Sequence, residues 1–183
     1  MNKLHFKKKT TIFISALLIP AFFIFAGCGE QQVREEAETV FTEEDRVDMG
    51  RQPWVLDIEE ATIASPDYRN TRWTGEYMQM VFMSLKPGEI IDLEVHNNHD
   101  QFIRIEQGEA RVLMGETRDK LDFDKQVSDD WAVLIPAGYW HQVTNTGNVD
   151  LKLYTIYAPP EHPEGTNHRT YEEAEEYEHS HEH

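Results

Sequence analysis

The chain has 183 residues, which is enough for one domain of ordinary size together with a targeting segment and tails. A single cysteine, Cys28, excludes a disulfide framework and a thiolate zinc cluster. Acidic residues outnumber basic residues by 34 to 17, and a surface of that charge repels nucleic acid. We therefore expect no nucleic-acid partner.

Residues 1–27 have the three-part layout of a secretory signal. Four lysines precede an apolar run from Thr11 to Phe25, and small residues follow before Cys28. The ending FAGC resembles a bacterial lipobox, in which the cysteine becomes the first residue of the mature protein and carries acyl chains such as palmitate. We therefore predict a lipoprotein signal peptide over 1–27, lipidation at Cys28, and an extracytoplasmic protein anchored to the cell membrane by lipid. An uncleaved membrane anchor is the alternative.

Residues 28–50 are rich in Glu and Gln and contain few large apolar residues, which predicts an acidic linker. Without residues 1–27 the chain keeps 13 basic and 34 acidic residues, a net charge of −21. We expect most of these charges to serve solubility.

From residue 51 to residue 160, short runs rich in β-branched and aromatic residues alternate with Gly, Pro, Asn and Asp. The runs include MVFMSL, EIIDLEVH, QFIRIEQ, WAVLIPAG and LKLYTIYA. They recur at intervals of roughly 8 to 12 residues, a spacing that predicts an all-β sandwich or barrel over 51–160.

Residues 161–183 are a predicted C-terminal extension. Its segment TYEEAEEYEH is expected to form a short helix that Thr170 caps, with Glu173 at the third helical position. The Glu- and His-rich end can pick up metal loosely, although a solvated tail is the favoured interpretation. His162 and His168 precede the helix, and a fold of their loop over the barrel mouth is the less favoured alternative.

The segment LEVHNNHDQF, residues 93–102, raises the question of which polar side chains share one face. We expect two strands, 90–96 and 101–107, to form a hairpin whose turn contains His99, so that this histidine is exposed and outside any site. Strand alternation then places one set of side chains on a common face: Glu94, His96, Gln101, Ile103 and Ile105. The other face carries Leu93, Val95, Phe102 and Arg104.

Glu94 is thus predicted to point toward a buried face to which the hairpin contributes no Lys or Arg. A buried carboxylate is costly unless it is paired or bound to a metal ion. A metal ion would remove this cost. The alternative is a polar hairpin end that reaches solvent at a barrel mouth.

Two motifs in this region resemble those of the cupins, a superfamily of small β-barrels. The first cupin motif, G-x5-H-x-H-x3-4-E-x6-G, fits the spacing of Gly88, Glu94, His96, Gln101 and Gly108, although two of its three ligand positions are altered.

The second cupin motif, G-x5-P-x-G-x2-H-x3-N, falls on residues 130–145. Pro136, Gly138, His141 and Asn145 match, and Asp130 replaces the first glycine.

The resemblance covers roughly residues 53–160 and implies a small single-domain cupin. Its fold would be an all-β double-stranded β-helix (jelly-roll) barrel, here followed by the short C-terminal helix. It also implies one divalent metal ion held by Glu94, His96, Gln101 and His141. Zn, Fe, Mn and Ni all suit two imidazoles with oxygen donors. The ligand inventory is similar to that of phosphomannose isomerases, which are themselves cupins.

Cupins include isomerases, dioxygenases, sensors and storage proteins, so the resemblance implies less about function. We favour a metal-dependent enzyme acting on a small oxygenated or sugar-like molecule, by isomerisation or by oxygen insertion. The alternatives are a non-catalytic module that binds a sugar or a metal, and a degenerate cupin with a purely structural barrel. The apolar side chains on the second hairpin face suggest a homodimer, which is common among cupins.

Overall fold

The computed structural model describes residues 41–181, without the side chain of His181. The predicted signal peptide, the predicted lipidation site Cys28 and most of the predicted linker lie outside these residues. Within the part that is described, no helix has the length and apolar character needed to cross a membrane.

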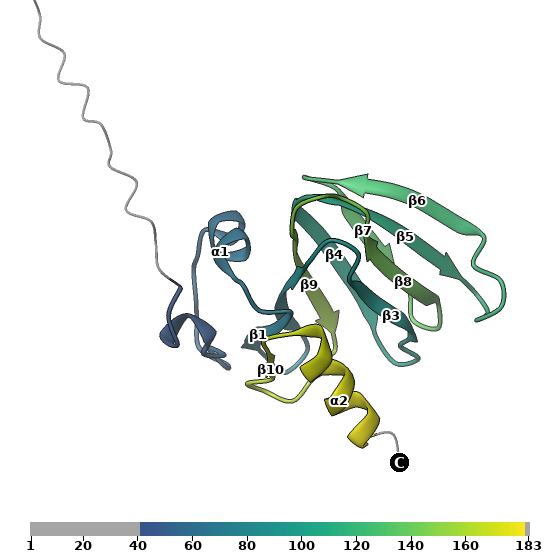
Figure 1. Cartoon of the computed structure of the whole chain (residues 1–183). Coiled ribbons are helices and arrows are strands. Elements are labelled where there is room, and N and C mark those ends of the chain that lie inside the picture. The colour runs from purple at the N-terminus through teal and green to yellow at the C-terminus, as the bar shows by residue number, and fades with distance from the viewer. Residues whose placement is uncertain (1–40, 182–183) are drawn as a thin grey trace, which may run out of the picture. The chain divides into compact units, whose positions relative to one another are not determined.

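The described residues form two antiparallel sheets that enclose one core (Figure 1). Sheet A has the strand order β10-β1-β2-β9-β4-β7, and sheet B has the order β3-β8-β5-β6. The strands of sheet A are β1 (Arg69–Thr74), β2 (Gln79–Leu85), β4 (Asp100–Gln107), β7 (Ala132–Ile135), β9 (Leu151–Ala158) and β10 (Asn167–His168). The strands of sheet B are β3 (Ile90–Val95), β5 (Glu109–Gly115), β6 (Phe123–Ser128) and β8 (Trp140–Asn145).

The predicted hairpin between residues 90–96 and 101–107 is wrong. β3 pairs with β8 in sheet B, whereas β4 pairs with β7 and β9 in sheet A. The segment between β3 and β4 therefore passes from one sheet to the other. Two strands that face each other across a barrel can direct their side chains into the same interior without being hydrogen-bonded, so the predicted inward set is retained. The predicted second face is wrong, because Leu93 and Val95 belong to sheet B and Phe102 belongs to sheet A.

The core lies between the two sheets and is built from alternate residues of the central strands. Ile103 and Ile105 are fully buried, as the predicted inward face requires, while Phe102 and Arg104 are half-buried on the outer face of sheet A. The other fully buried apolar side chains with this orientation include Val81, Met83, Leu85, Val143, Leu151 and Leu153.

Positive backbone φ angles at two positions of the cupin-like motifs explain which residue types stand there. Gly108 has a φ of 93°, and a Cβ there would lie 3.2 Å from the carbonyl oxygen of Asp150. Asp130 stands where the second motif has glycine, and its φ is 69°. Aspartate is among the few side chains that tolerate this left-handed region, so the departure from the motif keeps the turn.

The helix α1 (Ile58–Ala64), which packs against β9 and β4, was not predicted from the sequence. The Asp57 side chain accepts a hydrogen bond from the Glu60 N–H, and acidic residues occupy the first turn. These are ordinary helix-start signals. A one-turn helix η1 (Glu44–Arg46) precedes it.

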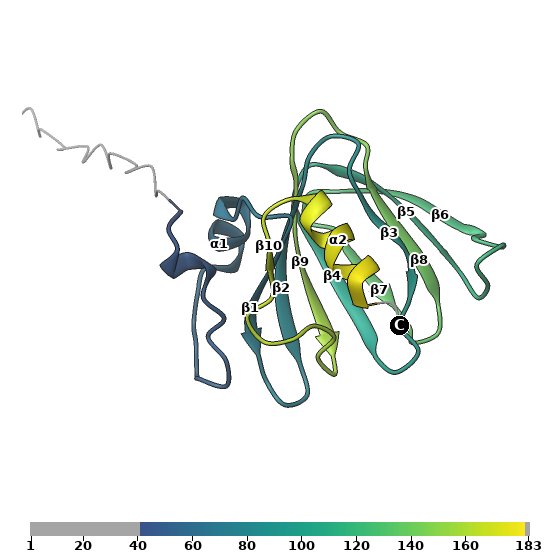
Figure 2. The ribbon, with the colours of Figure 1, turned by 60° about the horizontal axis from the view of Figure 1, so that its bottom comes forward.

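The helix α2 (Tyr171–His181) confirms the predicted C-terminal helix. The Thr170 hydroxyl accepts a hydrogen bond from the Glu173 N–H, as predicted, but the Glu173 carboxylate bonds the Arg169 N–H. The helix contacts β10 and lies between β10 and β3 in Figure 2. It therefore spans the seam between the two sheets.

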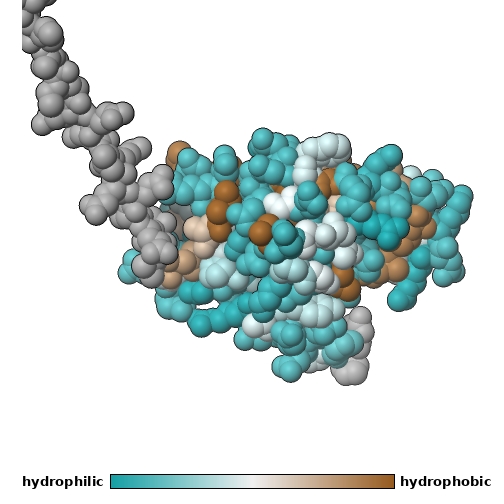
Figure 3. Space-filling model, turned by 45° about the horizontal axis from the view of Figure 1, so that its top comes forward, coloured by the Kyte–Doolittle hydropathy of each residue, from teal (hydrophilic) through white to brown (hydrophobic). Residues whose placement is uncertain are grey.

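The fold is all-β apart from these short helices, and the double-stranded β-helix prediction is confirmed. One face of the molecule is mostly hydrophilic with separate apolar patches (Figure 3). This agrees with the strongly acidic composition.

Candidate metal centre

Three of the four predicted ligands converge inside the barrel. The Glu94 Oε1 atom lies 3.2 Å from His96 Nε2 and 3.2 Å from His141 Nε2. His141 is fully buried, and the side chains of His96 and Glu94 are 9% and 26% exposed. Glu94, His96 and His141 thus form a compact group with one solvent-facing member.

Two strands of sheet B position this group. Ile91 pairs with Val143 and Glu94 pairs with His141, so three residues of β3 match two residues of β8. The extra residue is a β-bulge, which shifts the alternation of β3 by one position. Both Ile91 and Glu94 consequently face the interior, one in the core and one at the metal-ligand position.

A backbone contact fixes the tautomer of His141. Its Nδ1 lies 3.1 Å from the Tyr139 carbonyl oxygen, which can only accept a hydrogen bond, so Nδ1 carries the proton. In the neutral ring Nε2 is then a bare acceptor that faces the Glu94 carboxylate. Two acceptors at 3.2 Å repel unless a proton or a cation lies between them.

The charges of this group are strongly coupled. Burial disfavours ionisation of Glu94, but its hydrogen bonds with His141 and His96 outweigh that effect and lower its pKa. Burial disfavours a charged His96, yet its contact with Glu94 raises its pKa. The site therefore favours a carboxylate anion that is matched by positive charge.

Gln101, the fourth predicted ligand, comes from β4 on the opposite sheet. Its Nε2 donates to the Thr155 hydroxyl at 3.0 Å, which orients the amide. Its Oε1 is buried and has no hydrogen-bond partner. A buried carbonyl oxygen without a partner costs about 1–3 kcal/mol, which a bound cation would offset.

These residues fit a divalent metal ion. Metal–nitrogen and metal–oxygen bonds of about 2.0–2.2 Å at angles of 90–110° place neighbouring ligand atoms about 2.8–3.6 Å apart. The separations of 3.2 Å between Glu94 and the two imidazoles fall in this range. The donors are two imidazoles, one carboxylate and one neutral amide, a set that suits Zn, Fe, Mn or Ni.

The prediction that His99 is an exposed turn residue is wrong. His99 is 8% exposed, and its ring stacks on His96 with the centroids 4.5 Å apart. Its Nε2 lies 3.2 Å from Glu161 Oε2, and Glu161 Oε1 lies 3.6 Å from His96 Nδ1. One carboxylate thus contacts both rings, on the side of His96 away from Glu94.

His96, His99 and Glu161 are close enough to suggest a second ion site. The two imidazole planes, however, are only 29° from parallel. A metal ion binds an imidazole nitrogen in the plane of the ring, and two stacked rings do not point their lone pairs at one position. Glu161 is better placed to orient the two histidines than to share an ion with them.

A third group of possible ligands contains Glu106, Asp129 and Asp130. The Arg104 guanidinium contacts both Glu106 and Asp130. It already supplies a positive charge to this group, so we assign no ion there.

The loop after β9 closes over the interior, the outcome that the sequence analysis favoured less. The His162 N–H donates to the Gln79 side chain at 3.0 Å, and the Gln79 amide donates to the His162 carbonyl at 2.8 Å. The His162 ring meets Tyr157 edge-on, and Tyr157 meets His96 in the same way. The loop thereby brings Glu161 to the metal group.

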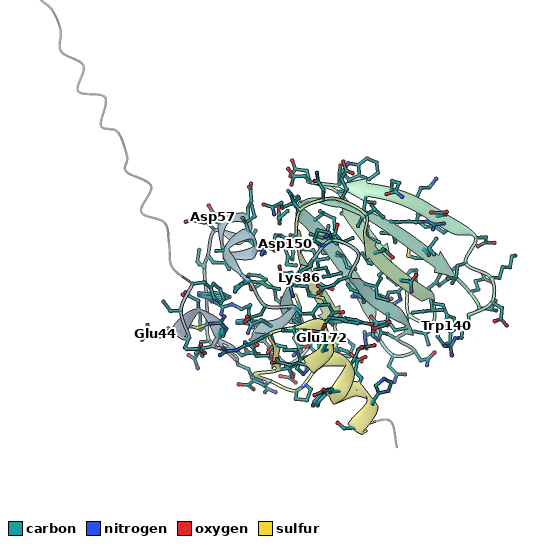
Figure 4. The ribbon with its side chains drawn as sticks, viewed as in Figure 1. Glu44, Asp57, Lys86, Trp140, Asp150 and Glu172 are labelled. Atoms are coloured by element: carbon teal, nitrogen blue, oxygen red, sulfur yellow. The ribbon has the colours of Figure 1, made fainter. Side chains whose placement is uncertain are left out.

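A cavity of about 550 Å³ opens beside the metal group. Glu94 lines it together with side chains from β3, β8 and α2, and Trp140, labelled in Figure 4, marks its wall at the start of β8. Its lining residues are Asp92, Leu93, Glu94, Val95, Arg118, Trp140, Gln142, Glu175, Glu178 and His179. Glu94 is the one member of the metal group that lines this cavity, so the cavity reaches the group at its carboxylate.

The sequence did not predict a role for the buried Tyr157 and Arg69, or for Glu161, which is partly exposed. Glu161 had a signal, since it lies in the Pro-rich segment that also carries His162. Tyr157 and Arg69 read as ordinary strand residues, and only the packing of the strands places them in the barrel interior.

Comparisons with known proteins agree with this fold. Residues 81–157 match the cupin domain family. A solved crystal structure from Bacillus halodurans has 49% sequence identity and a TM-score of 0.70, and the match covers 71% of this chain and 98% of that one.

Two curated relatives are also similar. The uncharacterized protein YrkC of Bacillus subtilis is 53% identical over 123 residues, which cover 67% of this chain and 66% of the relative. An uncharacterized protein of Acanthamoeba polyphaga mimivirus is 44% identical over 115 residues, which cover 62% of this chain and 70% of the relative. About a third of each relative therefore has no counterpart in the match.

Proposed function

The chain belongs to the cupin superfamily, and from that premise we propose that it is a metal-dependent enzyme acting on a small oxygenated molecule. One observation carries the proposal. The bare Nε2 of His141 and the Glu94 carboxylate face each other at 3.2 Å, with His96 equally close and the free amide oxygen of Gln101 in the same interior. Acceptors gathered in this way need a proton or a metal ion between them, and the free Gln101 oxygen beside them favours the ion.

The four side chains have distinct roles in holding the ion. Glu94 supplies the one negative charge, and the neutral donors His96, His141 and Gln101 leave a divalent ion with a net positive charge. When bound, such an ion would polarise a carbonyl or hydroxyl oxygen of a bound molecule. The Tyr139 carbonyl and the Glu161 carboxylate keep the two rings in orientation.

Other interior groups would act on the bound molecule. Burial raises the pKa of Tyr157, and the nearby Glu94 charge adds to this effect, so the phenol keeps its proton and remains a hydrogen-bond donor. The nearly complete burial of His141 and Gln101 excludes water from the inner side of the site. Exclusion of water strengthens every electrostatic interaction with the bound molecule.

The reaction is either an isomerisation by proton transfer or an insertion of oxygen. Both need an ion that holds an oxygenated carbon skeleton, and they differ in whether that ion changes its oxidation state. Zinc in the purified protein would favour isomerisation, and iron would favour oxygen chemistry. The set of ligand residues is similar to that of phosphomannose isomerases, and this similarity supports isomerisation.

Metal content of the purified domain tests the proposal. The protein is prepared without residues 179–183, so that the terminal histidines cannot bind metal, and is compared with a Glu94→Ala/His141→Ala double variant by elemental analysis. We expect about one divalent ion per chain in the parent and at least tenfold less in the variant. Equal metal in both, or none in the parent after reconstitution with each of the four ions, contradicts the proposal.

A further inference from the structure

Arg69 is a buried cation beside the metal group that the proposed function does not use. It begins β1, is 5% exposed, and pairs across the strands with His168. Its Nη1 donates to Glu178 Oε1 at 2.7 Å, but its Nε is buried without a hydrogen-bond partner. A buried guanidinium with an unused donor is costly to maintain, since its charge and its N–H groups both lack water.

Two histidines beside Arg69 also have unused nitrogen atoms. His168 is 8% exposed, and its Nδ1 has no partner; His162 Nε2 has none either. Burial lowers the pKa of both rings, and the charge of Arg69 lowers it further. Three basic side chains therefore share one buried region, with unpaired nitrogen atoms on each.

Glu178 reaches this region from outside. It belongs to the last turns of α2, its side chain is 42% exposed, and it lines the same cavity as Glu94. The carboxylate that neutralises the buried Arg69 therefore comes from a half-exposed position on a polar helix near the end of the described chain. Exchanging it for a free carboxylate would leave the charge around Arg69 unchanged.

We propose that Arg69 binds the carboxylate of a small ligand, and that Glu178 occupies this position until the ligand displaces it. His162 and His168 have nitrogen atoms available to hydrogen-bond the bound carboxylate. Glu178 and Glu94 line one cavity, so a ligand that displaces Glu178 enters beside the carboxylate of the metal group. The ligand class is thus a small carboxylic acid with a further oxygen group, an assignment that rests on the proposed function for its metal-bound end.

The acidic lining of the cavity does not oppose this exchange. Asp92, Glu94 and Glu175 are present before and after it, and Glu178 leaves as the ligand arrives. Arginine binds carboxylates through paired, charge-assisted hydrogen bonds, and Nε is one of the donors that such a pair uses. A free carboxylate can use both Nε and an Nη, whereas Glu178 contacts Nη1 alone.

Glycolate and glycolamide are a matched pair of probes, because they have the same size and differ in charge. Their binding to the full chain is measured by calorimetry, in the metal-free and the metal-loaded protein. We expect glycolate to bind at least tenfold more tightly than glycolamide in both forms, and Arg69→Gln to remove this preference.

Glu178→Gln is the decisive variant, because it changes a half-exposed side chain and removes the competing carboxylate. We expect it to bind glycolate about tenfold more tightly than the parent, an outcome that a purely structural ion pair would not produce. Glu176→Gln, an exposed position on the same helix, is the control and should match the parent.

An unchanged or weaker affinity of Glu178→Gln for glycolate overturns the inference. So does glycolate binding that requires the metal and survives Arg69→Gln, since the ion alone would then hold the ligand. Failure of the metal-content test with normal glycolate binding in the metal-free protein would contradict the proposed function and leave the Arg69 site standing.

Discussion

Gln101 departs from the cupin motif, which has glutamate at this position, and its amide oxygen is free to act as a metal ligand. Thr155 engages the NH₂ group and leaves the carbonyl oxygen free in the barrel interior. Because the motif's carboxylate is replaced here while Glu94 replaces one of its histidines, the ligand set keeps a single negative charge. The exchange of positions therefore preserves the electrostatics of the site.

We predict that Gln101→Leu lowers the affinity for a divalent metal about 10- to 100-fold, since it removes one donor and leaves the shape similar. Gln101→Glu should retain metal binding. Competition with a fluorescent chelator measures both, and Gln126→Leu, an exposed change on β6, is the control. An affinity of Gln101→Leu equal to that of the parent would remove Gln101 from the ligand set.

His162 predicts a pH dependence of stability. Burial, followed by the charge of Arg69, lowers its pKa from 6.5 to about 3. A histidine with a lowered pKa in the folded state stays neutral while the unfolded chain takes up a proton, so stability falls as pH drops from 6.5 toward 3. The effect is absent above pH 6.5, where both states are neutral.

Urea unfolding of the metal-free protein at pH 7 and pH 5 measures this effect. Between pH 7 and pH 5 the free energy of unfolding of the parent should fall by up to about 2 kcal/mol more than that of His162→Gln. This figure follows from about 1.36 kcal/mol for each unit of pKa shift. His179→Gln, exposed on α2, should behave as the parent does. Equal losses in the parent and His162→Gln would show that the ring is protonated in the fold.

At the scale of elements, the connection between β3 and β4 and the loop after β9 build the site. The first carries His96 and His99 from sheet B to sheet A, and the second carries Glu161 to both rings. Neither is a hairpin turn. A crossing between sheets places the side chains of a short segment at the interior of the barrel, whereas a hairpin turn would leave them in solvent.

Glu161→Gln is predicted to weaken metal binding about tenfold, because His96 loses the carboxylate that orients its ring. The cobalt-loaded Glu161→Gln variant should keep its fold and show an absorption spectrum that differs from that of the cobalt-loaded parent. A change that does not reach the metal ligands would leave this spectrum unchanged. Glu164→Gln in the same loop is the control. Identical spectra and affinities in Glu161→Gln and the parent would contradict the positioning role.

At the scale of the molecule, the apolar hairpin face from which the homodimer was predicted is divided between the two sheets, with Leu93 and Val95 in sheet B and Phe102 in sheet A. We propose the outer face of sheet A as the surface of the dimer. Leu134 is 71% exposed and lies across from Phe102, which neighbours Ile156 on β9. We expect light scattering to give twice the chain mass for the parent and one chain mass for Leu134→Glu. Val149→Glu, at another exposed apolar position, should stay dimeric. A monomeric parent would rule out this assembly.

The lipid anchor predicted at Cys28 lies outside the described residues and stays a proposal for the whole protein. Expression in a bacterial host, followed by fractionation, should place the parent with the membranes and Cys28→Ser in the soluble fraction of the envelope. Recovery of both in the same fraction would contradict lipidation at this residue.

The local pattern of the sequence was enough for the β-rich architecture, the capped C-terminal helix and the inward direction of Glu94, His96 and Gln101. These features depend on alternation, spacing and turn residues, which act over a few positions. Asp130 kept the turn that the motif assigns to glycine for the same local reason.

Only the tertiary structure decided that β3 and β4 lie in different sheets, that His99 and Arg69 are buried, and that Glu161 contacts His96 and His99. These facts depend on contacts between segments that are distant in the chain, such as Arg69 with Glu178, 109 residues apart. Alternation assigns a side chain to a face of its own strand, but the strand that lies opposite is chosen by the packing of the whole core. The identity of the groups around the ion is therefore a property of the fold.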